Sequence, residues 1–280
     1  MKPIFYTNLF FSTLLFCSVF SDCKKDDFTS TELTEVSDVI TANGIAADLK
    51  NLEEQAKTLN NTNVGNNCNI TLDTSHTISS HDRLTIDFGS SASSCHDNRF
   101  RSGKIIVDYS PNFKAANADV QFSFSNYNVG FTATTMYAIE NSSSTTVTHQ
   151  TFNSKGFLSW TNTCNLIIDK PNSGGTITYN ENITRTQTAG NALQMDFSNK
   201  FSIAGSSSGI CSDGNSFAAS IFSSNLLLKD LSCAKYFTKG ELDITPKNIA
   251  TIGADFGDGS CSNNTVTLSR NYTSKIVDLQ

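Results

Sequence analysis

The sequence predicts a mainly β protein, with an antiparallel, sandwich-like body and one helix close to its N-terminus. Charged residues make up 16% of the 280-residue chain, against roughly 25% in ordinary soluble domains. Ser, Thr and Asn take their place, and Phe is the commonest aromatic residue, with 20 copies. Apolar residues alternate with these uncharged polar residues along much of the chain, as in antiparallel sheets with one packed and one wet face. A chain of this length can bury a substantial core.

Residues 1–22 have the features of a signal peptide. Lys2 provides a basic start, and the apolar stretch Leu9–Phe20 has twelve residues. A membrane-spanning helix needs about 20 apolar residues, so this stretch is too short to cross a bilayer. A buried N-terminal helix is the alternative interpretation. The abrupt change to charged residues after Phe20 favours the signal peptide.

Residues Ser21–Cys23 resemble a lipoprotein cleavage site, in which the cysteine becomes the new N-terminus and carries acyl chains. The run Lys24–Asp27 is similar to the Lys/Asp-rich signal that directs many Bacteroidota-type lipoproteins to the cell surface. Asp22 departs from the pattern, which usually has a small uncharged residue before the cysteine. The resemblance implies lipid attachment at Cys23, membrane contact through this anchor, and residence in the outer membrane or on the cell surface. Without acylation, the chain would be periplasmic or secreted.

Residues 23–62 are predicted to form a tether and an amphipathic helix. Thr29 and Glu32 have the spacing of a capping box, in which each side chain bonds to the backbone N–H of the other residue. Apolar residues follow at helical spacing: Ile45, Leu49, Leu52, Ala56 and Leu59. Charged residues lie mostly on the other side, so this stripe is expected to pack the helix against the β body. The Asn-rich segment 60–67 ends the helix.

Residues 63–280 are predicted to form the antiparallel β body. Apolar residues occupy alternate positions over 105–109 and 120–124, which predicts two strands. The apolar phase then shifts at Tyr127, so a bulge or turn is expected at Ser125–Asn126. The same alternation predicts further strands around these positions: Ile177, Tyr179, Ile183, Leu193, Met195, Phe197, Val266 and Leu268.

A weak internal repeat links the two ends of the β body. The segment 87–89 (Asp-Phe-Gly) precedes Cys95, and the segment 255–257 (Asp-Phe-Gly) precedes Cys261. Each copy has an upstream cysteine at nearly the same distance, 27 and 28 residues away. The expected structure is a strand end with an inward Phe and a turn at Gly, because the other motifs of a protein kinase do not accompany Asp-Phe-Gly.

Six cysteines remain for the exported body, and an even number in an oxidising compartment suggests disulfides. They are Cys68, Cys95, Cys164, Cys211, Cys233 and Cys261. If the bridges follow the repeat, they are Cys68–Cys95 and Cys233–Cys261, which leaves Cys164–Cys211, although six cysteines allow 15 pairings. The sequence has no Cys-x-x-Cys, and no His lies at zinc-finger spacing from a cysteine pair. Neither a metal nor another cofactor is therefore expected.

The segment Thr85–Gly89, Cys95 and the segment Arg99–Val107 together resemble the signature of a family of uncharacterised Bacteroidota-type surface lipoproteins. That family repeats its Asp-Phe-Gly…Cys element near the C-terminus, as Asp255–Cys261 does here. The match runs over about residues 68–280. It implies a surface lipoprotein with a β body, and it implies no particular activity. The spacer between Gly89 and Cys95 is longer and richer in Ser than in the family.

Two patterns could carry catalysis. The segment Gly205–Gly209 matches the G-x-S-x-G motif of a hydrolase nucleophile elbow, with Ser207 as the nucleophile. That elbow needs a helix after the motif, whereas turn residues follow here, so a hairpin turn is favoured. His76, His81 and His96 lie among carboxylates and could bind a metal or transfer protons. Their polar, loop-like surroundings favour solvated side chains.

Three residues are candidates for ligand binding. Arg99 and Arg101 form the densest positive patch, and guanidinium groups suit carboxylates or sulfates. Solvated strand positions, or pairing with Asp87 or Asp108, are the alternatives. Trp160 could stack on a sugar ring if it is exposed, and a core aromatic residue is the alternative.

The net charge of −6 and the absence of a basic stripe argue against nucleic acid as a partner. The sequence therefore predicts a membrane-anchored exported lipoprotein that is a non-enzymatic binding or envelope protein, with a glycan or envelope component as its partner. A hydrolase acting on glycans or lipids is one alternative. A purely structural lipoprotein without a ligand is another.

Overall fold

The computed structural model describes residues 27–58, 71–73, 77–78, 81–95, 97–110, 119–141, 146–152, 154, 156–190, 198–233, 236–261 and 264–279. Within these residues the protein is mainly β, with one helix at its N-terminal side, as the sequence predicts. The predicted signal peptide, Cys23 and Cys68 lie outside the described residues. Among the described residues, no helix combines the length and the hydrophobicity needed to span a membrane.

The helix α1 covers Ser30–Thr58 and begins with the predicted capping box. The backbone N–H of Thr29 donates to Glu32 Oε2 (2.7 Å), and the backbone N–H of Glu32 donates to Thr29 Oγ1 (3.2 Å). These bonds satisfy two of the donors that the start of a helix otherwise leaves open.

The side chains of α1 are buried around its whole circumference over most of its length. Ile45, Leu49 and their neighbours in the predicted stripe are buried. Asp48, Lys50 and Glu53, which the sequence places mostly on a polar outer side, are buried as well. The expectation of a helix packed by one stripe is therefore wrong, because the sheet surrounds α1 and supplies charged partners for its polar side chains.

The β body is a single antiparallel sheet. Its strands are β1 (Thr71–Asp73), β2 (Thr77–Ile78), β3 (His81–Asp87), β4 (Ser93–Ser94), β5 (Phe100–Ser110), β6 (Asp119–Gly130), β7 (Met136–Asn141), β8 (Thr146–Phe152), β9 (Leu158–Asp169), β10 (Thr176–Ala189), β11 (Lys200–Ile210), β12 (Ser216–Ile221), β13 (Leu227–Asp230), β14 (Lys239–Pro246), β15 (Ile252–Asp258), β16 (Thr265–Arg270) and β17 (Thr273–Asp278). A short 3₁₀ helix, η1 (Pro171–Ser173), joins β9 to β10.

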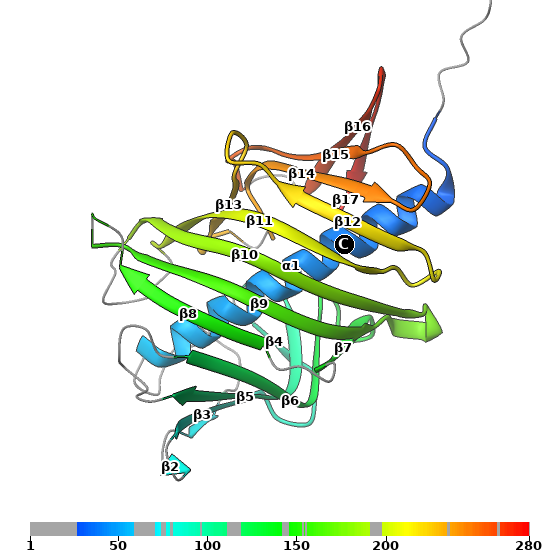
Figure 1. The fold of residues 1–280 in the computed structure, drawn as a ribbon. Coiled ribbons are helices and arrows are strands. Elements are labelled where there is room, and N and C mark those ends of the chain that lie inside the picture. The colour runs from blue at the N-terminus through cyan, green and yellow to red at the C-terminus, as the bar shows by residue number, and fades with distance from the viewer. Residues whose placement is uncertain are drawn as a thin grey trace, which may run out of the picture.

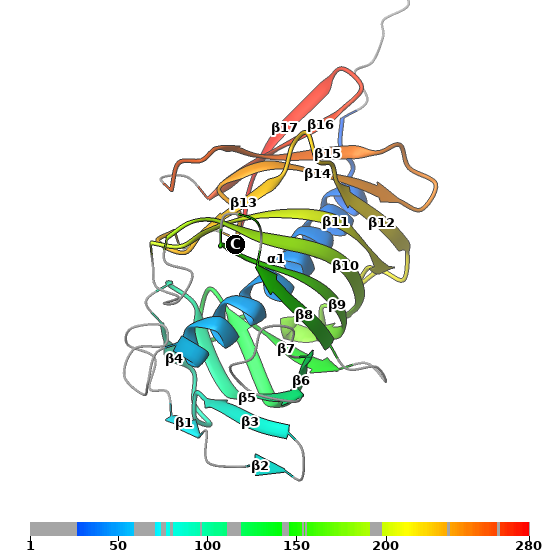
Figure 2. The ribbon, with the colours of Figure 1, turned by 60° about the vertical axis from the view of Figure 1, so that its left-hand side comes forward.

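The strands pair in a meander that curls around α1. β3 pairs with β5, β5 with β6, β9 with β10 and β10 with β11. β7 and β8 both lie between β6 and β9, while β12 and β13 both lie between β11 and β14. β15, β16 and β17 follow β14 in order, and the short strands β1, β2 and β4 pair with β3 or β5. Figures 1 and 2 show α1 running along the concave side of this sheet.

Contacts to α1 come from strands far apart in the sheet. Arg101 of β5, Arg185 of β10 and Arg270 of β16 each bond to a residue of the helix. The two flanks of the sheet therefore face each other across α1, which gives the body its sandwich-like form.

The predicted irregularity at Ser125–Asn126 is a β-bulge. In the pairing of β5 with β6, Ser102 lies opposite Asn128 and Lys104 lies opposite Ser125, so Gly103 faces two residues. Asn126 has a φ of 50° and Gly103 a φ of 78°. The extra residue moves the apolar set of β6 to a new phase, which keeps both halves of the strand facing the core.

Both copies of the Asp-Phe-Gly element have the same local structure. Phe88 and Phe256 are buried. The backbone N–H of Gly89 donates to Asp87 Oδ1 (2.9 Å), and the N–H of Gly257 donates to Asp255 Oδ1 (2.8 Å). The inward Phe is confirmed in both copies, and each Gly has a positive φ. The predicted strand end is confirmed at Gly89, which follows β3, whereas Gly257 lies inside β15, beside a shift in its register with β14.

The cysteines agree with the predicted bridges only in part. Cys233 and Cys261 form a disulfide, and Cys95 is disulfide-bonded. The expected Cys164–Cys211 bridge is wrong, because both residues are buried thiols.

The strand register explains why these two thiols do not meet. Cys164 lies opposite Glu181, and Glu181 lies opposite Ser207, four residues before Cys211. At about 3.4 Å per residue, the offset along the strands is roughly 14 Å. Disulfides need Cα atoms about 4.4–6.8 Å apart.

Candidate functional site

The three predicted ligand-binding residues lie in the interior. Arg99, Arg101 and Trp160 have exposed fractions of 1%, 0% and 2%. The predictions that Arg99 and Arg101 face solvent, or pair with Asp87 or Asp108, are also wrong. Asp87 pairs with Lys104 (2.8 Å) instead. Asp108 pairs with Arg83, whose Nε lies 2.6 Å from Asp108 Oδ1.

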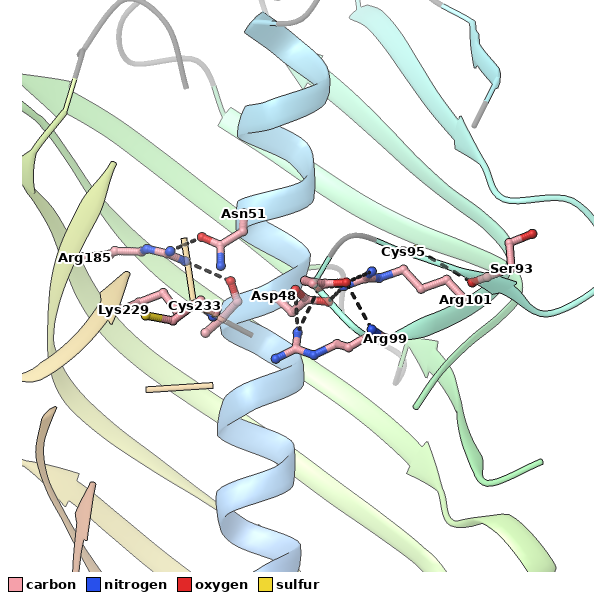
Figure 3. A network of polar contacts seen from close by, with 11 residues as sticks. Asp48, Asn51, Ser93, Cys95, Arg99, Arg101, Arg185, Lys229 and Cys233 are labelled. Carbon is pink, nitrogen blue, oxygen red and sulfur yellow. Dashed lines mark hydrogen bonds and ion pairs between the residues drawn. The ribbon is translucent and has the colours of Figure 1, made fainter. Parts of the chain in front are cut away.

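Arg99 and Arg101 bind a carboxylate of α1. Arg99 Nη1 lies 2.6 Å from Asp48 Oδ1, and Arg101 Nη2 lies 2.7 Å from Asp48 Oδ2. Asp97 accepts a second bond from Arg101 Nη2 (2.5 Å). Burial alone would raise the pKa of Asp97, but the charges of Arg101 and Arg99 lower it well below its ordinary value. Figure 3 shows Arg99 and Arg101 reaching Asp48 of α1 from the β5 side.

A second group of cations approaches α1 from the opposite flank of the sheet. Arg185 Nη1 donates to the carbonyl of Ala47 (2.9 Å), and Arg185 also bonds to Asn51. Lys229 Nζ donates to the carbonyl of Cys233 (3.3 Å). Burial, together with the nearby charge of Arg99, lowers the pKa of Lys229 to about 7. In Figure 3 these residues face Arg99 and Arg101 across the helix.

Trp160 packs beside this second group of cations and does not line an open cleft. Its ring packs edge-on against Phe201, with centroids 5.4 Å apart. Lys50 Nζ lies 5.2 Å from the centre of the indole, and the Arg185 guanidinium lies 4.4 Å from the centre of Phe201. Trp160 is therefore a core aromatic residue, and the prediction of an exposed sugar platform is wrong.

We call Asp48, Asp97, Arg99, Arg101 and Arg185 the helix clamp. Buried arginines of this kind hold a fixed geometry through paired charges and planar guanidinium groups. Arg101 and Arg185 bond to α1 from opposite flanks of the sheet. The clamp thus fixes the helix within the sheet, and it offers no open surface to a ligand.

Ser207 does not have the geometry of a nucleophile elbow. It lies within β11, and its side chain is buried on the helix side of the sheet. Its hydroxyl is 3.3 Å from Asn43 Nδ2, and the Tyr179 hydroxyl donates to Asn43 Oδ1 (2.9 Å). A hairpin turn, the interpretation favoured from sequence, is also wrong here, because the motif continues the strand.

The remaining predicted residues are only partly described. His76 and His96 lie outside the described residues, and so does the side chain of His81. Asp230, Cys233 and Cys261 bring potential metal ligands within 4.8 Å of one another. Two of these three are joined in the disulfide, so they do not form a thiolate metal site.

The outer face of the sheet carries two aligned rows of short side chains. Strand register places the rows across β9, β10, β11, β12 and β14. The first row is Thr163, Asn182, Ser206, Ser220 and Asp243, and the second is Asn165, Asn180, Ser208, Ala218 and Thr245. These ten residues are exposed or half-buried and line a hollow of about 560 Å³. We call this hollow the polar groove.

The polar groove has few charges and many hydrogen-bonding groups. Asp243 is the one charged side chain among the ten residues of its rows, and the buried Glu181 also lines the hollow. Hydroxyl and carboxamide groups both donate and accept hydrogen bonds. The groove is wide because no side chain in the rows is longer than Asn or Asp.

Ser, Thr and Asn at alternate strand positions are the sequence signal for this groove. On their own they predict only an ordinary wet face of an antiparallel sheet. Their alignment across five strands depends on strand register, which hairpin geometry sets and composition does not reveal.

Comparison with known proteins finds no matching family model, no matching curated protein and no matching solved structure. The resemblance to surface lipoproteins therefore stays a prediction.

Proposed function

We propose that this protein is an exported, lipid-anchored and non-enzymatic binding protein whose polar groove holds a neutral glycan. The observation that carries this proposal is the pair of aligned rows in the polar groove. An extended sugar chain presents hydroxyl groups at regular intervals, and the rows present hydroxyl and carboxamide groups at the regular spacing of strands, about 4.8 Å.

The charge of the groove supports a neutral ligand over an anionic one. No Lys or Arg occurs among the lining residues, which include Asn180, Asn182 and Ser206. Phosphate and sulfate ligands depend on such cations. Arg99 and Arg101, the densest positive patch in the sequence, are buried in the helix clamp and do not line the groove.

The disulfide Cys233–Cys261 supports the export part of the proposal. Disulfides persist in oxidising compartments and are rare in reducing ones. The sequence around Cys23 supports the anchor, since two acyl chains on one residue suffice for stable membrane attachment.

Binding to immobilised neutral oligosaccharides, with sulfated and phosphorylated ones beside them, tests the ligand class. We expect saturable binding to a neutral chain. Ser206→Phe fills the groove and is expected to weaken this binding at least tenfold, as is Asn182→Ala, which removes groups worth about 1–3 kcal/mol.

The matched control is Ser274→Phe on β17, an exposed position outside the groove. Equal binding by wild type and Ser206→Phe would contradict the proposal. Shortening of the bound glycan during the assay would show that the protein is an enzyme after all.

Fatty-acid labelling in the producing cell tests the anchor separately. Wild type is expected to incorporate the label, and Cys23→Ala is expected to lose it. An intact mass that begins at Met1 would contradict both export processing and lipidation.

A further inference from the structure

Four carboxylates gather where the first turns of α1 meet the turn between β11 and β12. They are Glu32, Glu35, Asp38 and Asp213. Arg270 pairs with Glu32, and Lys170 Nζ lies 2.6 Å from Asp38 Oδ1. Within the described part of the chain, Glu35 and Asp213 have no such cation.

The Asn215 amide lies between these two carboxylates. Its Nδ2 is 2.8 Å from Glu35 Oε1 and 3.0 Å from Asp213 Oδ2. Glu35 is 1% exposed, and its other oxygen, Oε2, has no hydrogen-bond partner among the described residues. A buried carboxylate oxygen without a partner is costly, so this arrangement calls for a further ligand.

The helix dipole does not account for Glu35. Favourable interaction of an acid with the start of a helix is confined to about the first turn, which here contains Glu32. Glu35 Oε1 and Asp213 Oδ2 both accept a bond from the same amide nitrogen of Asn215, so two carboxylates lie close together. A cation between them would offset the repulsion of their charges.

We propose that Glu35, Asp213 and Asn215 form a calcium site. The Asn215 amide would turn so that Oδ1 faces the ion, and the two carboxylates would supply the opposing charge. Carboxylate and carboxamide oxygens are the ligands that Ca²⁺ prefers, and its flexible coordination accepts water at the remaining positions. This proposal departs from the sequence prediction that no metal binds, which rests on the spacing of cysteine and histidine residues.

A softer metal does not fit the same place. Glu35, Asp213 and Asn215 offer only carboxylate and carboxamide groups, whereas zinc and copper prefer thiolate or imidazole ligands. The Cys211 thiol is directed at the Glu35 backbone carbonyl (3.7 Å).

The site lies at the end of the hairpin that carries part of the polar groove. β11 and β12 supply Ser206, Ser208, Ala218 and Ser220, and the turn 211–215 joins these two strands. Bound Ca²⁺ would tie this turn to α1 and fix the end of the hairpin. The calcium proposal does not depend on the ligand of the groove.

Titration of the purified protein with CaCl₂ after chelator treatment tests the site. With so few protein ligands, we expect one equivalent of Ca²⁺ to bind with a Kd of about 0.1–1 mM, the range of extracellular sites. At 10 mM CaCl₂ the Tm is expected to rise by roughly 4 °C.

The decisive variant is Asp213→Asn, which keeps the acceptor for the Asn215 N–H but removes one charge. It should lose the calcium response, whereas Asp258→Asn should keep it. Asp258 makes the same kind of turn bond, to the N–H of Ser260, and is exposed. A calcium response that is absent in wild type, equal in Asp213→Asn, or matched by MgCl₂ would overturn the proposal.

Discussion

At the scale of single residues, the helix clamp shows how buried charges define this interior. Asp48 bonds to both Arg99 and Arg101, and all three are buried. Removing one partner of a buried pair leaves an uncompensated charge, which costs more than the pair itself contributes. A single carboxylate therefore controls the position of Arg101, in β5, and of Arg99, just before β5, against α1.

Asp48→Asn is predicted to lower the free energy of unfolding by about 3–5 kcal/mol. Asp108→Asn, which breaks the partly exposed pair with Arg83 (2.6 Å), should cost about 0–1 kcal/mol. Urea unfolding followed by the fluorescence of Trp160, the single tryptophan, measures both. Similar losses in the two variants would show that the clamp is no stronger than a surface pair.

Glu181 gives the interior a predicted pH dependence. Burial raises its pKa from 4.5 to about 7, so the folded protein holds this proton more tightly than the unfolded chain does. The resulting stabilisation is complete below pH 4.5 and disappears as the pH rises through about 7. It amounts to at most about 3 kcal/mol.

Glu181→Gln should therefore flatten the stability curve between pH 4.5 and 7 and make the protein more stable than wild type at pH 8. Unfolding in urea across this pH range measures the effect. The control is Glu140→Gln, at an exposed position. The prediction is wrong if wild type and Glu181→Gln lose stability in parallel.

At the scale of elements, local sequence patterns are sufficient to predict whether a segment is helix or strand and where several of these elements begin or end. The capping box at Thr29 and Glu32, the bulge beside Asn126 and the strand end at Gly89 all depend on neighbours in the chain, and each is confirmed. The environment of α1 could not be predicted this way. Whether Asp48 or Lys50 faces water depends on strands that are distant in sequence.

One contact of α1 carries a prediction about packing. A Cβ added at Gly44 would lie 2.3 Å from the ring of Tyr236. That ring cannot easily move, because the Arg99 guanidinium lies 4.2 Å from its centre and Phe131 packs against it at 5.5 Å. Gly44 therefore lets the segment after β13 close over the helix.

Gly44→Ala is predicted to destabilise the protein by about 1–3 kcal/mol through overpacking, although Ala favours helix over Gly by about 1 kcal/mol. In a Tyr236→Ala background the same change should be neutral or stabilising. A double-mutant cycle in urea measures the coupling. Stabilisation by Gly44→Ala in the wild-type background would contradict the proposed contact.

At the scale of the whole molecule, the curling of the sheet around α1 is the feature that sequence did not reveal. Alternation predicts strands and their inner faces, but it does not tell a flat sheet from a curled one. The same limit applies to the candidate site. Residue type alone makes Arg99, Arg101 and Trp160 candidates for ligand binding, whereas their burial excludes that role and strand register assembles the polar groove.

The central position of α1 also determines how this protein would bear mechanical load. With a lipid on Cys23, as proposed, six residues separate the acylated position from the start of the helix at Ser30. A force that drags the body away from the membrane would then pull on the innermost element along its axis. Detaching the body from its anchor would require shearing the helix past its surrounding strands. The force that detaches the body would then be the force that unfolds it.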